Sequence, residues 1–296
     1  MKKYFNDHKK LIIMSVLMIA FVAACQSARD QQGNLKEGML ITLNTGYGEC
    51  ISQGWFNIFV WPVAQLINIV AGGTDAGFGI IVVTILLNAL IAVFTIKQQV
   101  ATQKMQLVQP ELEKLQAKYA GKTDQNSKMR QAQEMQALYS KHNINPFGQI
   151  ITLFVQFPVI FAVYQAVIRA EAVDTGSFLG IKLSQTPIDG FKALNIGVII
   201  IYILMILFQF LAFKLPQYMQ KREKEKAHVK TKDYAKPEKK GKMQNSMNMM
   251  MYMSLGMVVL FSINWPLGMS FYWMVSAFTR VIQSIIIQKK FIKNEF

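Results

Sequence analysis

The residues of this chain that could do chemistry are polar side chains set inside apolar segments. Residues 78–96 carry no charge and are long enough to cross a hydrocarbon core of about 30 Å as a helix. Thr84, Asn88 and Thr95 lie on one face of that helix, with Asn88 near its middle. Because an unpaired amide is costly in lipid, we expect this face to meet other helices or water.

Similar polar faces occur in the later apolar segments. Residues 146–168 contain Gln149, Thr152 and Gln156 at helical spacing, and residues 193–213 contain Tyr202 and Gln209 seven positions apart. One such side chain is explained by a hydrogen bond between packed helices, worth about 1 kcal/mol. The size of the whole set favours a hydrated cavity. The candidate groove residues are Thr84, Asn88, Gln149, Thr152, Gln156, Gln209, Trp273 and Arg280.

The residue sets that enzymes and metal sites need are missing from the sequence. The apolar segments contain no acid, which argues against a proton relay, and no HExxH or glycine-rich phosphate loop occurs. Two cysteines without a CxxC motif argue against a disulfide scaffold. The methionines between Met243 and Met253 suit Cu(I), but flexible packing is the commoner role. We therefore expect a non-enzyme without cofactor or metal.

The charge pattern predicts a membrane topology. The chain has 296 residues, 52% of them hydrophobic, and a formal net charge of +15. Of its 32 basic residues, eight lie in 97–145 and eleven in 214–242. Since lysine and arginine collect in cytoplasmic loops, these segments and the basic tail are expected inside. No nucleic-acid substrate is predicted, although the same basic segments could contact the ribosome.

The N-terminus has the pattern of a bacterial lipoprotein signal. A basic start and a short apolar run end in Val22-Ala23-Ala24-Cys25, which resembles a lipobox. Residues 1–24 would then be removed, and Cys25 would carry the lipid outside the cytoplasm. An uncleaved first span with an incidental cysteine is the alternative. We assign no role to Cys50.

The remaining chain is divided by composition, and the sequence predicts an all-α membrane protein with five transmembrane helices. After a linker over 25–50, the one-sided apolar pattern of 51–72 predicts an amphipathic helix in the outer membrane interface. Residues 97–145 carry two apolar stripes separated by a polar loop, which favours a cytoplasmic helical hairpin over a plain linker. The expected spans are 78–96, 146–168, 193–213, 245–265 and 267–288. They are joined by the outer loop 171–190 and the basic loop 214–244, and the basic tail 289–296 follows.

Three stretches together resemble one known family. They are KQQVATQKMQLVQPELEKLQAKY, LYSKHNINPFGQIITLFVQFPVIFAVYQAV and NWPLGMSFYWMVSAFTRVIQSII. They resemble the YidC/Oxa1/Alb3 membrane protein insertases, above all the lipoprotein-type members of Gram-positive bacteria. The resemblance runs in unbroken order from about Ile51 to Ile287.

The resemblance implies a fold and a function. Members of this family help newly made proteins enter the plasma membrane, alone or with the Sec translocon. Their spans enclose a hydrophilic groove that opens to cytoplasm and lipid. Nascent membrane proteins, the ribosome, the Sec translocon and membrane lipids are the partners implied. One departure concerns Asn88, which stands where family members of this type usually place an arginine, so we expect a groove that works by hydration more than by charge.

Two other interpretations remain open from the sequence. A small-solute channel or transporter could use the same polar cavity, but no internal repeat is visible in the sequence. A lipoprotein that only supports the Sec translocon would instead bury the polar faces against one another.

Overall fold

The computed structural model describes residue 28 and residues 35–72, 75–142, 144, 148–226 and 242–292. The expected signal peptide, Cys25, the middle of the basic loop and the last four residues lie outside this part. So do the side chains of Gln149 and Thr152. Within this part, the chain divides into two compact units.

The first unit comprises residues up to 83, 154–186 and 266–269. It holds α2 (Tyr47–Ser52), α3 (Asn57–Ala71), the start of α4 (Ala76–Lys118) and the C-terminal part of α6 (Gly148–Arg169). A short α7 (Glu171–Thr175) follows, and then a hairpin of β1 (Ser177–Phe178) and β2 (Ile181–Lys182), in which Ser177 pairs with Lys182. The expected outer loop thus has secondary structure of its own.

The core of the first unit depends on close helix contacts at small residues. A Cβ atom added to Gly79 of α4 would lie 2.8 Å from the backbone oxygen of Ile67 in α3. Gly268, at the start of α11 (Leu267–Ile287), packs as closely on Val167 of α6. The α11 start is also fixed to the loop after β2, because Gly268 N donates to Leu183 O at 2.9 Å. These contacts bring four helices, α3, α4, α6 and α11, around buried aliphatic side chains.

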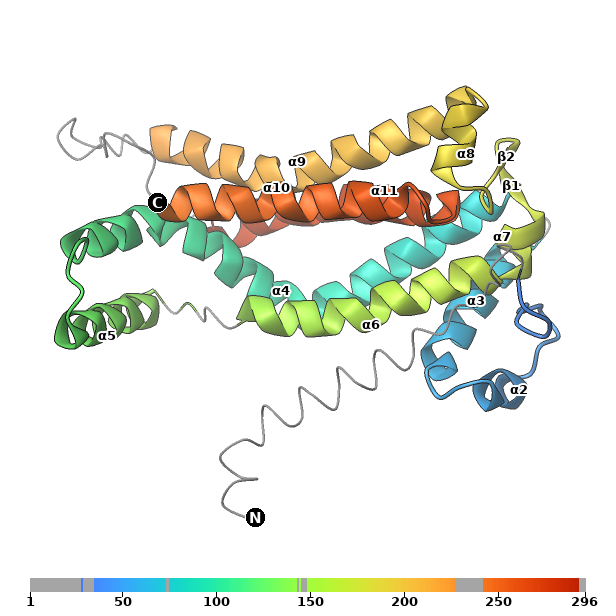
Figure 1. Cartoon of the computed structure of the whole chain (residues 1–296), viewed down its shortest axis with the longest axis horizontal. Coiled ribbons are helices and arrows are strands. Elements are labelled where there is room, and N and C mark those ends of the chain that lie inside the picture. Colours follow the sequence, from blue (N-terminus) through green and yellow to red (C-terminus); the bar gives the residue numbers. More distant parts are fainter. Residues whose placement is uncertain are drawn as a thin grey trace, which may run out of the picture. The chain divides into compact units, whose positions relative to one another are not determined.

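The second unit comprises 84–153, 187–265 and 270–296. Its elements are most of α4, α5 (Gln125–Lys141), α8 (Pro187–Lys192), α9 (Ile196–Lys226), α10 (Lys242–Ser262), most of α11 and the π-helix η2 (Gln288–Ile292) (Figure 1). Two helix starts are capped by polar side chains. Asp124 accepts from Ser127 N at 2.8 Å before α5, and Asn195 accepts from Gly197 N at 3.1 Å before α9.

Aromatic and hydroxyl contacts join the long helices of the second unit. The Phe208 ring of α9 packs on Phe278 of α11 with centroids 5.3 Å apart. Tyr202 of α9 donates to Val259 O of α10 at 2.7 Å, and Ser262 donates to the Tyr202 hydroxyl at 3.2 Å. In this unit α9 therefore packs on both α10 and α11.

Three helices in the described part of the chain are long and apolar enough to cross a membrane. They are Ala76–Met105, Ile196–Arg222 and Leu267–Lys290. Shorter apolar helices are found at Asn57–Ala71 and Tyr252–Ser262. The described part of the chain is therefore helical apart from the β1–β2 hairpin and an isolated bridge between Ile41 and Ala170, and it contains three candidate spans.

Candidate functional site: a polar network between apolar helices

The candidate groove residues that the structure groups most clearly lie in α4, α9 and α11 of the second unit. Asn88, Gln209 and Arg280 come from these three helices, in that order, and Arg280 is half-buried. Asn88 is 8% exposed and Gln209 is 4% exposed. Polar groups withdrawn this far from the surface need hydrogen-bond partners inside the protein.

Ser276 joins these residues into one network. Its hydroxyl donates to Asn88 Oδ1 at 3.3 Å and accepts from Arg280 Nη1 at 3.2 Å. The other end of the guanidinium, Nη2, donates to Gln209 Oε1 at 2.8 Å. A second link between α11 and α4 comes from Gln283, whose Nε2 donates to Asn88 O at 3.4 Å. The network therefore crosses three helices and contains one positive charge.

The network leaves hydrogen-bonding capacity unused. Arg280 bonds only to neutral oxygens in the described residues, those of Ser276 and Gln209. The Nδ2 atom of Asn88 is buried without a partner in the same part of the chain. A half-buried cation with neutral partners and a buried amide N–H without a partner both favour water or a polar group of a bound molecule nearby.

The other predicted groove residues have different surroundings. Thr84 is 1% exposed in the second unit, and Trp273 of α11 stacks on Trp265 with centroids 5.5 Å apart. Gln156 is half-buried but belongs to the first unit. Gln149 and Thr152 are helical residues whose side chains lie outside the described ones. For these five residues, as for Asn88, Gln209 and Arg280, the assignment to a groove stays a prediction.

Ser276 and Gln283 were not predicted as site residues. Both fall outside the stripe of Ser270, Trp273, Ala277, Arg280 and Ser284 that the spacing of polar residues indicates. Ser276 could have been found from the sequence because it precedes Arg280 by four positions. Residues four apart lie on the same side of a helix and can bond to each other.

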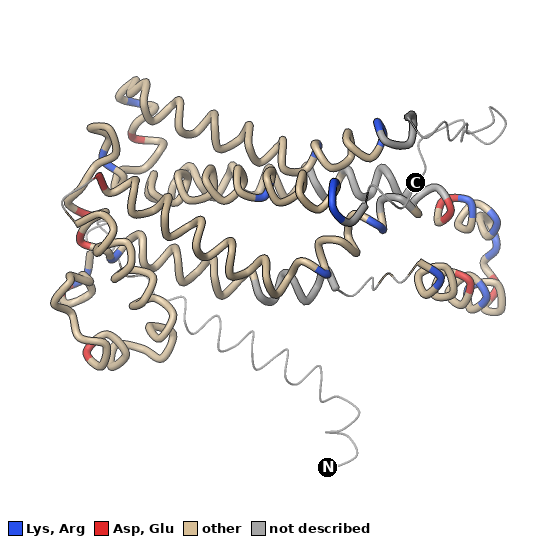
Figure 2. The backbone as a smooth tube through the Cα atoms, turned by 180° about the vertical axis from the view of Figure 1, so that it is seen from behind, with Lys and Arg blue, Asp and Glu red and all other residues tan. Residues whose placement is uncertain are grey.

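The charged hairpin is the second candidate site. The first expected span and the first arm of the expected hairpin form one continuous helix, since α4 runs from Ala76 to Lys118. Its end pairs with α5 over an apolar cluster of Val108, Leu112 and Ile144. Figure 2 shows Lys, Arg and acidic residues gathered on α5 and on the adjoining end of α4.

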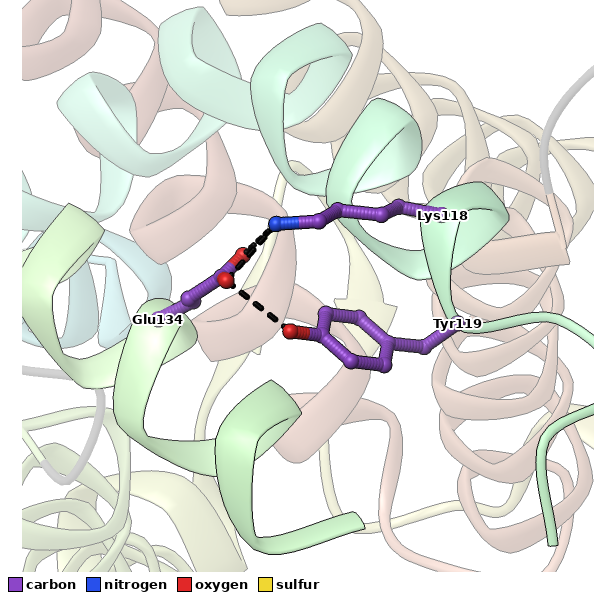
Figure 3. A network of polar contacts seen from close by, with 3 residues as sticks. All are labelled: Lys118, Tyr119 and Glu134. Carbon is purple, nitrogen blue, oxygen red and sulfur yellow. Dashed lines mark hydrogen bonds and ion pairs between the residues drawn. The ribbon is translucent and has the colours of Figure 1, made fainter. Parts of the chain in front are cut away.

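One carboxylate holds the tip of this hairpin together (Figure 3). Glu134 of α5 accepts from Lys118 Nζ at 2.7 Å and from the Tyr119 hydroxyl at 2.9 Å. The hydrogen bond from Lys118, and then that from Tyr119, lowers the pKa of the Glu134 carboxyl. The Lys118 and Glu134 side chains are exposed to water, so their ion pair contributes little to stability.

This contact predicts a small, pH-dependent loosening of the hairpin. Because the Glu134 pKa is lower in the folded hairpin, its contribution is present above the ordinary value of 4.5 and is lost as the pH falls through the folded value. Hydrogen exchange of the α5 amides, corrected for the intrinsic rate, should therefore accelerate slightly at acid pH. Glu134→Gln should remove that acceleration, whereas Lys128→Gln on exposed α5 surface should keep it. An unchanged acid response in Glu134→Gln would exclude this role.

Comparison with known proteins identifies the family. The model of the 60Kd inner membrane protein family matches residues 67–294, most of the chain. The chain belongs to the YidC/Oxa1 family. It is 31% identical to "Membrane protein insertase MisCA" of Bacillus subtilis over 243 residues, covering 81% of each chain. It is 28% identical to "Membrane protein insertase YidC 2" of Bacillus anthracis over 96% of this chain and 94% of that one. It is 30% identical to "Membrane protein insertase YidC 1" of Streptococcus pyogenes over 86% and 82%.

Proposed function

We propose that this protein is a membrane protein insertase that helps newly made proteins enter and fold in the bacterial plasma membrane. The observation that carries the proposal is the Asn88–Ser276–Arg280–Gln209 network, a buried polar site between helices that are apolar enough to lie in lipid. Family membership supports the same function. The alternative of a small-solute channel receives no support from the relatives, whose names are those of insertases.

The proposed topology has five spans around a groove that opens to the cytoplasm. In addition to the three candidate spans in α4, α9 and α11, it takes α6 and α10 as membrane helices. The lipid-anchored N-terminus at Cys25 and helix α3 lie outside, and the α4–α5 hairpin, the basic loop and the basic tail lie inside. The ribosome, approached by the basic segments, and the Sec translocon are the proposed partners.

Arg280 changes the expected chemistry of this groove. Asn88 alone suggested a site without charge, but the guanidinium of Arg280 bonds to the same serine hydroxyl as Asn88. We therefore propose that the positive charge of the site comes from α11. It would attract acidic groups in the polar flank of an entering protein, because a charge pair is strong where water is scarce.

The mechanism that follows needs no catalytic residue and no cofactor. Moving a polar flank across a bilayer in one step is costly, since each polar group loses its water in an apolar medium. A groove that offers the amide of Asn88, the hydroxyl of Ser276 and the charge of Arg280 replaces part of that water. The apolar segment of the substrate then leaves sideways into lipid.

Photo-crosslinking tests this function directly. A photoreactive residue at position 88 should form adducts with a ribosome-held nascent chain that carries one transmembrane segment. Position 86 is the control, because Leu86 is 53% exposed and Asn88 is 8% exposed on the same helix. We expect adducts from 88 and not from 86. Adducts from neither position, in a protein that accumulates normally, would contradict the proposal.

A further inference from the structure

A second arginine, Arg169, is buried at the C-terminal end of α6 in the first unit. It is 3% exposed, and each of its three guanidinium nitrogens donates a hydrogen bond to an oxygen. Nε donates to Met39 O at 2.7 Å, Nη1 to Asn57 Oδ1 at 2.7 Å and Nη2 to Gln53 Oε1 at 2.6 Å. The three oxygens are neutral, so geometry rather than an opposite charge holds the guanidinium in place.

The backbone around Arg169 is tied to the same N-terminal segment. Ile41 N donates to Arg169 O at 2.7 Å, and Glu171 N donates to Ile41 O at 3.1 Å. Ile41 and Ala170 form a parallel bridge between these two stretches. Side chain and backbone thus fasten residues 39–57 to the end of α6.

Hydrogen bonds to the same N-terminal segment bury the polar side of α3 and leave its apolar side exposed. Its polar residues Asn57, Gln65 and Asn68 are buried, and Asn68 Nδ2 donates to Ile41 O at 2.7 Å. Its exposed side is apolar, with Phe59 49% and Ile69 61% exposed. An amphipathic helix that buries its polar face and exposes its apolar face is matched to a lipid surface.

We propose that Arg169 is a positioning residue that locks residues 39–57 against α6 and so holds the apolar face of α3 toward the membrane surface. The lock consists of the three oxygen acceptors on Met39, Gln53 and Asn57. The membrane orientation rests on the proposed function, whereas the lock itself rests on the contacts within the first unit.

Cys50 supplies a natural reporter for this lock. It is fully buried, and its Sγ lies 3.8 Å from Arg169 Nη2. Burial raises the pKa of the Cys50 thiol, more than the neighbouring guanidinium lowers it. A buried thiol with a raised pKa reacts slowly, so rapid alkylation would report that the lock has opened.

The first experiment measures alkylation of Cys50 by a water-soluble maleimide in membrane vesicles. Arg169→Gln should raise the rate roughly tenfold or more, because local opening exposes the thiol. Arg169→Lys should fall between parent and glutamine, since an ammonium retains the charge without the planar fork. Lys182→Gln on β2 is the matched control for loss of a positive charge at an exposed site. Cys50→Ser measures labelling at any other thiol.

The second experiment tests the orientation of α3. In the Cys50→Ser background, Phe59→Cys should react faster with a lipid-soluble than with a water-soluble maleimide. Adding Arg169→Gln should lower that ratio severalfold, and Arg169→Lys should restore part of it. A ratio that Arg169→Gln leaves unchanged would overturn the positioning role.

The outcome stays decisive if Arg169→Gln accumulates poorly. Gln53→Ala removes one half-buried acceptor and should raise the alkylation rate of Cys50 by a smaller factor. Parental alkylation rates in both Arg169→Gln and Gln53→Ala would overturn the lock. These experiments measure how accessible the thiols are and do not depend on insertion activity. If Cys50 were protected in the parent protein but that protein inserted no substrate, only the proposed function would be contradicted.

Discussion

Arg280→Gln is expected to lower the insertion of a single-span test protein with an acidic flank by about tenfold or more, the effect of losing roughly 1.4 kcal/mol of attraction in the groove. A test protein with a neutral flank should be affected much less, since it forms no charge pair. The measurement is protease protection of the translocated flank in vesicles that contain only the variant. Lys289→Gln, at an exposed position beyond α11, is the matched control and should insert both substrates like the parent.

A double variant distinguishes charge from local packing. Asn88 and Arg280 meet at the hydroxyl of Ser276, so an arginine at 88 would place the charge in the same network. Asn88→Arg combined with Arg280→Gln should therefore recover most of the insertion of the acidic substrate. Equal insertion of both substrates by Arg280→Gln alone would contradict the proposal that α11 supplies the charge.

Gly79→Ala is expected to destabilise the protein by about 1–3 kcal/mol, the usual cost of overpacking a close contact. The new Cβ would lie 2.8 Å from Ile67 O and 3.1 Å from the Ala71 Cβ, and a backbone oxygen moves only with its helix. Loss of α3–α4 packing should appear as a lower unfolding temperature in detergent.

Gly256→Ala is the control for the same chemical change. Gly256 lies within α10, and a Cβ there meets nothing within 4 Å. Alanine is favoured over glycine inside a helix by up to about 1 kcal/mol, so Gly256→Ala should be neutral or stabilising. If both variants unfolded at the parental temperature, close approach at Gly79 would be excluded.

The polar network of the second unit illustrates what spacing along one helix can predict. Polar residues at helical intervals singled out Asn88, Gln209 and Arg280, and the structure joins these three through Ser276. Spacing shows which side of a helix is polar but does not show which neighbour each residue meets. Tyr202 and Gln209 are seven positions apart on α9, yet Tyr202 bonds to α10 and Gln209 to α11.

Helix α3 shows a second limit of sequence patterns. Its one-sided composition predicted an amphipathic helix, and the helix forms over Asn57–Ala71. The pattern left open what the polar side contacts. The structure buries Gln65 and Asn68 against backbone oxygens of Thr42 and Ile41, more than twenty residues earlier in the chain. Those partners lie in irregular backbone, which has no periodicity to read.

The long sequence distance across the Arg169 lock has a consequence for biogenesis. Asn57 and Arg169 are 112 residues apart, which at about 5–20 residues per second separates their synthesis by roughly 6–22 s. During that interval Asn57 and Gln53 have no guanidinium to bind, and the hydrogen bonds available to residues 39–57 are those within the N-terminal part of the chain, such as Gln65 to Thr42 and Asn68 to Ile41. Until the end of α6 has been made, Cys50 therefore lacks the cover that the proposed Arg169 lock gives it. On this proposal, the speed of translation sets how long Cys50 waits for that cover.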